Sequence, residues 1–151
     1  MAIRNAKFGM RNDGEMRNCE CGMRNRTSGG ELRRGDDLRK RTKSFALRVI
    51  GLVDSLPRGK SSDVIGRQLL RSGTSVGANY RAACRAKSSA DFISKMGTVE
   101  EETDESLFWM ELLIESGMVQ EQLLKELMSE SQEILAIIVA SIRTVRKTAT
   151  S

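Results

Sequence analysis

Four arginines are spaced so that one helix would present them in a single row. Placed at about 100° per residue, they fall within roughly 80° of one another along about 27 Å of helix. They are Arg67, Arg71, Arg81 and Arg85. Guanidinium groups on a rigid helix can bind successive phosphates, which gives salt-dependent nucleic-acid binding with little sequence selection. The alternative is an ion-pair network with the acidic side of a third helix, in the same chain or in a neighbouring copy. The spacing leaves both interpretations open.

Catalytic chemistry has few candidate residues. The chain contains no histidine, which excludes Ser/His and Cys/His nucleophile systems. The acidic run Glu100–Glu105 suggests a di-metal carboxylate site, but such sites need Glu-x-x-His pairs, and these acids fall mostly on the outer side of their helix. Cys19, Cys21 and Cys84 are too few and too scattered for a zinc site or a disulfide framework. We therefore expect reduced thiols, no cofactor, no metal and no enzymatic activity, with a metal-dependent nuclease as the enzymatic alternative.

One segment is apolar on nearly every side of its expected helix. Leu107–Ile114 reads Leu-Phe-Trp-Met-Glu-Leu-Leu-Ile, and Trp109 and Leu113 are expected to point away from the core. A helix that is apolar all round needs cover all round, which an isolated four-helix bundle does not supply. The segment therefore predicts a protein interface. The predicted oligomer-interface residues are Phe108, Trp109, Leu112 and Leu113, together with the small residues Gly73 and Gly77, which favour the close approach of another helix.

The composition favours one helical domain. The chain has 151 residues, a single proline and 4% aromatic residues, which suits helices and leaves few side chains to stack on bases. Its apolar runs are far shorter than the roughly 20 residues of a membrane span, and its N-terminus lacks the apolar segment of a signal peptide. We therefore expect no membrane association and a cytoplasmic location.

Charge is unevenly distributed along the chain. Residues 37–87 carry 12 basic and 3 acidic side chains, whereas residues 88–142 carry 2 basic and 12 acidic ones. This asymmetry fits a nucleic-acid surface, and it fits equally two halves that neutralise each other within or between subunits.

Four helices are expected after an N-terminal tail. Residues 1–36 contain an imperfect repeat of an apolar residue followed by Arg-Asn, and they have too few apolar side chains to offset chain entropy. We predict a disordered basic tail, either an RNA-binding segment or low-complexity sequence, followed by a folded domain over residues 37–148. The predicted signals are a first helix starting at Asp36 or Asp37, a second capped at Ser61 or Ser62 and running to about Lys87, a Ser88–Asp91 capping box before the third, and a stop at Gly117 before the fourth.

The apolar residues of each expected helix recur at steps of three and four, as in antiparallel bundles. The expected core faces are Leu38, Thr42, Phe45, Val49, Leu52 and Leu56 in the first helix; Ile65, Leu69, Ser72, Val76, Tyr80 and Ala83 in the second; Phe92, Met96, Val99, Thr103, Leu107, Met110 and Ile114 in the third; and Val119, Leu123, Leu127, Ile134, Ile138, Ile142 and Val145 in the fourth.

Several blocks of the chain resemble the 23S ribosomal RNA intervening-sequence protein family, also called four-helix bundle proteins. The blocks are 68–72 (Gln-Leu-Leu-Arg-Ser), 75–79 (Ser-Val-Gly-Ala-Asn), 88–96 and 98–113, and the likeness extends over residues 38–147. Arg71 matches the family's basic residue after Gln-Leu, and Asn79 matches its asparagine after the small-residue run. The family pattern commonly continues Asn-Ile-Ala-Glu-Gly, whereas this chain has Asn79-Tyr-Arg-Ala-Ala83. Any role of that glutamate and glycine is therefore not carried over.

The resemblance implies an oligomer. Members of the family are helical bundles that assemble into rings, typically pentamers. Some are similar to the accessory variability proteins of diversity-generating retroelements, which bind a reverse transcriptase and nucleic acid, and others are encoded within ribosomal RNA genes. The implied partners are thus further copies of the chain, RNA or DNA, and a reverse transcriptase or ribonucleoprotein.

From these features together we predict an all-α fold, an antiparallel up-down-up-down four-helix bundle that forms a cyclic homo-oligomer, most simply a homopentamer. The predicted function is a non-enzymatic scaffold that binds nucleic acid or a nucleoprotein partner through the arginine row. The alternative is a purely structural self-assembling protein without a nucleic-acid role.

Overall fold

The computed structural model describes residues 31–149, with side chains described for residues 37–149. This part of the chain forms four helices: α1 (Glu31–Asp54), α2 (Lys60–Ala83), α3 (Ser89–Glu115) and α4 (Glu121–Ala149). Strands are absent from it, and none of its helices is long and apolar enough to cross a membrane. The predicted all-α, four-helix fold is confirmed. Residues 1–30 of the predicted tail lie outside the described residues.

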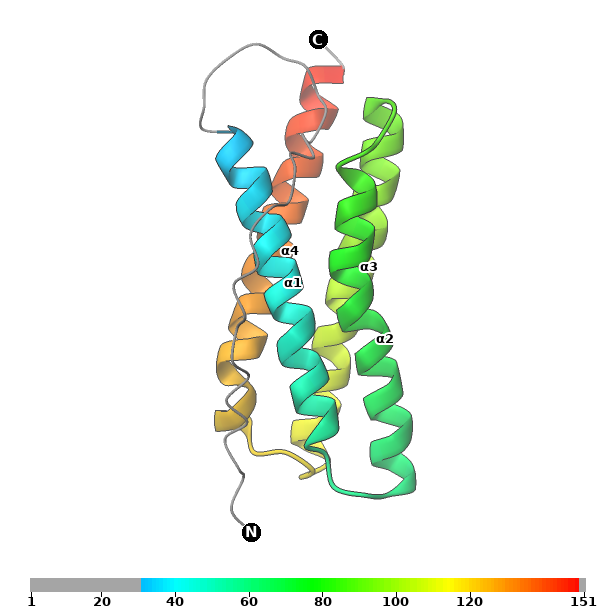
Figure 1. Ribbon diagram of the computed structural model, residues 1–151, viewed down its shortest axis with the longest axis vertical. Coiled ribbons are helices and arrows are strands. Elements are labelled where there is room, and N and C mark those ends of the chain that lie inside the picture. Colours follow the sequence, from blue (N-terminus) through cyan, green and yellow to red (C-terminus); the bar gives the residue numbers. More distant parts are fainter. Residues whose placement is uncertain (1–30, 150–151) are drawn as a thin grey trace, which may run out of the picture.

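Successive helices run in opposite directions. Figure 1 shows the chain descending through α1, rising through α2, descending through α3 and rising through α4. α2 packs against α1 and α3, and α4 packs against α3 and, less extensively, against α1. Short turns between consecutive helices favour this alternating arrangement. The two sides of α1 are therefore packed to different extents.

The core is built from aliphatic side chains of all four helices. Its largest fully buried side chains are Phe45, Leu69, Met96, Met110, Leu113, Leu124, Ile134 and Ile138. The expected core faces agree with this core except near the α3–α4 connection. There Leu113 is buried more completely than Ile114, and Leu124 is buried while Leu123 is 56% exposed. A straight helix drifts by about 20° per heptad from a strict seven-residue repeat, which adds up to about 60° over the three heptads from Phe92 to Leu113 and turns the buried face of α3 toward Leu113.

Three glycines of α2, the first of them Gly66, let α1 approach closely. A Cβ atom at Gly73 would lie 2.8 Å from Val49 Cγ1, and one at Gly77 would lie 3.4 Å from the carbonyl oxygen of Thr42. At Gly73 only a residue without a side chain fits this spacing unchanged, whereas the distance at Gly77 is an ordinary van der Waals contact for a Cβ. The expected close approach is present, but the partner is α1 of the same chain. Gly73 and Gly77 are buried there and are not available for the predicted oligomer interface.

Ion pairs link α1 to α4. The Arg41 guanidinium donates to both carboxylate oxygens of Glu130, each at 2.9 Å, and to Glu133 Oε2 at 2.8 Å. Hydrogen bonding to Glu130 raises the pKa of Arg41, and the same contact lowers the pKa of Glu130. A longer pair joins Arg48 to Glu126 at 3.8 Å. The less extensively packed side of α1 is thus bridged by charged side chains, and the bidentate pair is the strongest link.

Two helix starts differ from the sequence prediction. α1 begins at Glu31 instead of Asp36 or Asp37, because Glu31 to Arg34 are good helix formers and a glycine at residue 35 costs only about 1 kcal/mol relative to alanine. α2 begins at Lys60, and no side chain caps it. Ser62, one of the two expected caps, is buried instead.

The predicted helix stop at Gly117 is present. Gly117 follows α3 with a φ of 73°, in the left-handed region where a glycine ends a helix without steric cost. The chain then turns back into α4.

Candidate nucleic-acid interface

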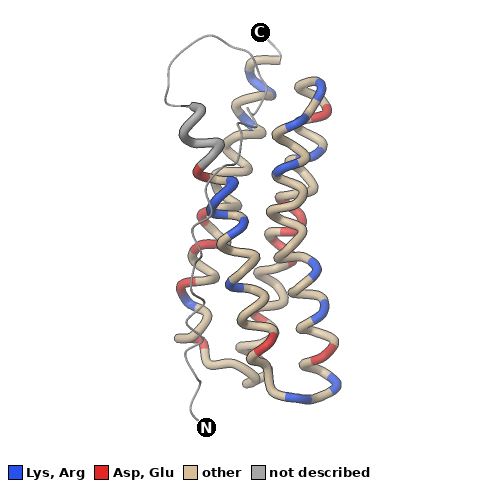
Figure 2. Tube along the Cα trace, viewed as in Figure 1, with Lys and Arg blue, Asp and Glu red and all other residues tan. Residues whose placement is uncertain are grey.

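All four predicted arginines lie exposed on α2 or directly after it, and three of them have no carboxylate partner among the described residues. Arg67, Arg81 and Arg85 are exposed to solvent, and none of them forms an ion pair within the described part of the chain. Figure 2 shows that Lys and Arg positions recur along α2 from one end to the other. These three guanidinium groups are therefore available to an external anion.

Further basic side chains extend this surface at both ends of α2. Arg58 is exposed in the turn before the helix, Lys60 is exposed at its first residue, and Lys87 is exposed in the turn after it. Asp63 is the acidic residue between them in the sequence. The exposed side of α2 thus carries a clear excess of positive charge.

Arg71 differs from the other three arginines because α3 neutralises it. One guanidinium nitrogen donates to Glu105 Oε1 at 2.5 Å, and another lies 3.6 Å from Glu102 Oε1. The hydrogen bond to Glu105 raises the pKa of Arg71. The ion-pair interpretation therefore holds for Arg71, and the phosphate-binding row loses this member.

The pKa values of the two carboxylates that face Arg71 are shifted in opposite directions. Glu105 Oε1 also accepts a hydrogen bond from Trp109 Nε1 at 3.0 Å, and this bond, together with Arg71, lowers the pKa of Glu105. The Glu102 side chain is 16% exposed, and its Oε2 atom accepts no hydrogen bond from the described residues. Burial raises the pKa of Glu102. Glu105 is thus the main partner of Arg71.

Arg85 lies in a turn and not on the α2 helix. α2 ends at Ala83, which makes the predicted continuation to about Lys87 wrong. The helix ends here because Ser88 caps α3: Ser88 Oγ accepts a hydrogen bond from the Asp91 N–H at 3.1 Å, and Asp91 Oδ2 accepts one from the Lys87 N–H at 2.9 Å. The predicted cap by Ser88 and Asp91 is therefore present, but the Asp91 carboxylate accepts from the N–H of Lys87 where a capping box would use that of Ser88. Arg85 is still exposed beside the C-terminal end of α2.

The apolar segment of α3 exposes only part of its predicted interface. Phe108 is 49% exposed, and its ring meets that of Trp109 edge to face with centroids 4.9 Å apart. Trp109 and Leu112 are half-buried. Leu113 is fully buried because it belongs to the core of its own bundle, so the prediction that it points away from the core is wrong.

Helix geometry places a further exposed apolar residue, Val64, beside these side chains, and the sequence pattern did not predict it. It is 49% exposed and lies about 20° around α2 from Arg71, on the side that faces α3. Because α2 and α3 are antiparallel, moving toward the start of α2 corresponds to moving toward the end of α3. Val64 is seven residues before Arg71, and Trp109 and Leu112 are seven residues after Glu102 and Glu105, the partners of Arg71. Val64 therefore lies level with Trp109 and Leu112. The sequence alone does not indicate this neighbourhood, because it depends on how α2 and α3 are aligned. We call Val64, Phe108, Trp109 and Leu112 the apolar patch.

The acidic run of α3 does not gather into a metal-binding group in the described part of the chain. No three side chains of the Cys, Asp and Glu types converge there. Glu101 and Asp104 are exposed, and Thr103 occupies the core position between them. The run therefore serves the α2–α3 contact through Glu102 and Glu105.

Comparison with known proteins gives a family match. The family model described as 23S rRNA-intervening sequence protein matches residues 36–140. Comparison with curated proteins gives no match.

A solved structure is similar to the chain over most of the bundle. It is the crystal structure of a protein with unknown function from the S23 ribosomal protein family of Bacteroides thetaiotaomicron VPI-5482. The sequence identity is 33% and the TM-score is 0.68, and the alignment covers 72% of this chain and 97% of that one.

Proposed function

The chain belongs to the 23S rRNA-intervening sequence protein family, and from this premise we propose that it is a non-enzymatic helical scaffold that binds the phosphate backbone of nucleic acid. Arg67, Arg81 and Arg85 are the phosphate ligands. The supporting observation is that these three guanidinium groups are exposed and form no ion pair with the described residues. Family membership defines the fold and leaves the ligand open, since the similar solved structure is described as having unknown function.

The spacing of the arginines suits a strand of nucleic acid. Arg67 and Arg81 are separated by about 21 Å along α2 at 1.5 Å per residue. A strand presents roughly one phosphate every 3.4 Å, so about six phosphates pass this length. Arg58 and Lys87, exposed in the turns at either end, lengthen the same surface. A strand lying along α2 would therefore meet unpaired positive charge near both ends of the helix.

The chemistry of this surface predicts binding without base selection. Guanidinium groups that contact phosphates fix the position of a strand and do not read its bases. The one tryptophan, Trp109, is half-buried and bonded to Glu105, so it is not placed to stack on a base. The affinity should therefore depend strongly on salt and weakly on sequence.

A charge-matched pair of variants tests the proposal. Arg67→Gln with Arg81→Gln removes two charges from α2, and Lys125→Gln with Arg143→Gln removes two exposed charges from α4. We expect the first variant to bind generic RNA roughly ten-fold more weakly at low salt, and the slope of log affinity against log salt to fall by about 1.4–1.8. Fluorescence anisotropy at several salt concentrations measures both. Equal weakening in the two variants would refute the assignment to α2.

We further propose that copies of the chain associate through the apolar patch, in a ring for which five copies are the expected number. Phe108 and Val64 are each 49% exposed, and burying such side chains against a second copy is favourable. Phe108→Ser should shift the oligomer toward monomer in sedimentation velocity. Leu47→Ser, at a leucine of α1 that is 57% exposed, is the matched control and should leave the oligomer unchanged.

The structural-assembly alternative makes a different prediction. If the chain only assembles, the two arginine substitutions on α2 leave any weak RNA binding unchanged, while Phe108→Ser still alters sedimentation. If the scaffold acts in the cytoplasm with a ribonucleoprotein or a reverse transcriptase, such a partner should co-purify with the unaltered chain and be lost from the Arg67→Gln/Arg81→Gln variant.

A further inference from the structure

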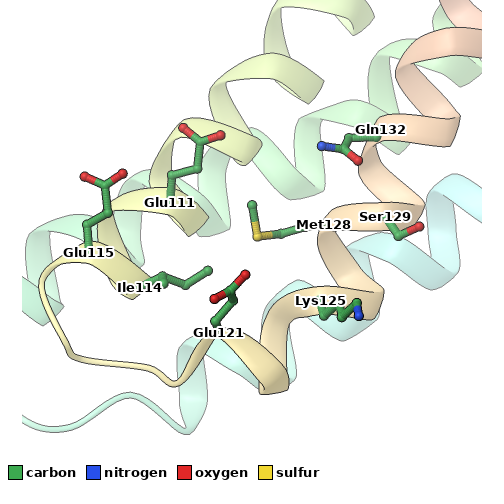
Figure 3. Close-up of a pocket in the computed structure, with 8 residues that line it drawn as sticks. All are labelled: Glu111, Ile114, Glu115, Glu121, Lys125, Met128, Ser129 and Gln132. Atoms are coloured by element: carbon green, nitrogen blue, oxygen red, sulfur yellow. The ribbon is translucent and has the colours of Figure 1, made fainter.

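A shallow groove lies on the outer surface between α3 and α4, near the turn that connects them. It has a volume of about 540 Å³, and Ile114 of α3 and Met128 of α4 form its apolar floor. Figure 3 shows these two side chains facing each other across the groove, with the Glu121 carboxylate between them. Both floor residues also pack against the core. The floor is therefore held in place by the fold.

The rim of the groove is acidic. Glu111 and Glu115 line it from α3 and Glu121 lines it from α4, against one basic residue, Lys125. Figure 3 shows the Lys125 side chain pointing away from the floor. None of the three glutamates forms an ion pair with another residue among those described. An apolar surface bordered by uncompensated negative charge fits a segment that carries apolar and cationic side chains together.

The groove is long enough for a stretch of polypeptide. A second hollow of about 530 Å³ shares Gln132 with it and is lined by apolar side chains of α4, including Leu135 and Val139, and by Arg143 at its far end. From Glu121 to Arg143 the two hollows follow about 33 Å of helix. An occupant of this length is a chain segment and not a small molecule.

We propose that the N-terminal segment of the same chain, residues 1–30, binds in this groove. Its repeat places an apolar residue directly before an arginine four times, at Ile3, Met10, Met16 and Met23. Each unit supplies one apolar side chain for the floor and one guanidinium for the rim. The segment carries 6 basic and 3 acidic side chains, which is opposite in sign to the groove. The site is separate from the exposed arginines of α2.

The segment can reach the groove from the start of α1. α1 is about 36 Å long, and Cys21, ten residues before it, can lie about 33 Å away in an extended chain. Met10 can lie about 70 Å away. Tethering gives the segment an effective concentration on the order of millimolar at its own groove, which favours binding within one chain over binding between chains. Occupation would cover an acidic surface that repels nucleic acid.

The native cysteines provide a test in the full chain. Cys19 and Cys21 belong to the segment, and Cys84 is only 8% exposed. Ser129→Cys introduces a thiol in the groove with minimal change of shape, and Ser44→Cys introduces one on the exposed surface of α1. Ser44 is the more demanding control, because α1 directly follows the segment and shorter loops close at lower entropic cost.

Under mild oxidation of dilute protein at low salt, Ser129→Cys should form an intrachain disulfide with Cys19 or Cys21 at least ten-fold faster than Ser44→Cys. Mass spectrometry of the linked peptides identifies the pair. Adding Glu111→Gln, Glu115→Gln and Glu121→Gln, or raising the salt concentration, should remove this advantage. Equal rates at the two positions, an advantage that survives loss of the glutamates, or a covalent dimer in place of the intrachain product would each overturn the proposal.

Discussion

The two sides of α1 are held by different physical means. Toward α2, Val49 lies against Gly73 with no room for a side chain, and the backbone at Thr42 lies at contact distance from Gly77. Toward α4 the packing is less extensive, and Arg41 spans the gap to Glu130. Closely packed side chains cannot move independently, because a displaced methyl group pushes against all of its neighbours. Long, partly solvated side chains adjust at little cost. The α1–α2 side should therefore be far more sensitive to substitution than the α1–α4 side.

The largest effect is expected at Gly73. In Gly73→Ala the new Cβ would lie within 3.0 Å of both Val49 methyl groups, and Val49 is a stiff, β-branched residue that cannot swing aside. Overpacking costs about 1–3 kcal/mol. Because both methyl contacts are shorter than 3.0 Å, we expect the upper part of this range, about 2–3 kcal/mol. The better helix propensity of alanine returns about 1 kcal/mol, which leaves a net loss of about 1–2 kcal/mol. Urea unfolding followed by circular dichroism measures it.

Gly51→Ala is the matched control for this prediction. A Cβ at Gly51 meets nothing within 4 Å, and the residue is exposed on α1. The substitution should stabilise the fold by about 0.5–1 kcal/mol through helix propensity alone. Gly73→Ala as stable as Gly51→Ala would show that α1 can shift on α2, and the contrast between the two sides of α1 would then fail.

A smaller effect is expected at Arg41. The Arg41 and Glu130 side chains are 28% and 24% exposed, so solvent screens their interaction, and we expect Arg41→Gln to cost about 1 kcal/mol. The cost should depend on pH. In the folded chain the pKa of Glu130 lies below its ordinary value of 4.5, so the stabilisation is present above pH 4.5 and is lost as pH falls through the lowered value. Urea unfolding from pH 7 to pH 3 should show the difference between the unaltered chain and Arg41→Gln shrinking below pH 4.5. A difference that does not vary with pH would mean that Arg41 acts by packing alone.

The same contrast explains what the sequence could and could not predict. The core faces and the glycine contact are local patterns, because each follows from the period of one helix. Ion pairs between helices depend on the register of one helix along the other, and the sequence of a single helix does not determine that register. Arg41 and its partner Glu130 are 89 residues apart in the chain, and nothing in the sequence pairs them.

Within the candidate site, exposure of Arg67 and Arg81 follows from their opposition to the core face of α2, which periodicity does reveal. Neutralisation of Arg71 does not follow in the same way. Arg71 is about 40° around α2 from Arg67 at 100° per residue, and this modest turn brings it to Glu105 of α3. The helical wheel predicted a common row, and only the register of α3 separates its members.

The smallest effect is expected at Arg48, on the same side of α1 as Arg41. Its nearest carboxylate oxygen, on Glu126, is 3.8 Å away, and the two side chains are 43% and 92% exposed. An exposed pair at this distance gains little, because water screens the charges and ordering both side chains costs entropy. Arg48→Gln should therefore change the free energy of unfolding by less than about 0.3 kcal/mol. If Arg48→Gln instead matched Arg41→Gln, the α1–α4 side would respond to total positive charge on α1. The bidentate geometry at Glu130 would then not be what holds these two helices together.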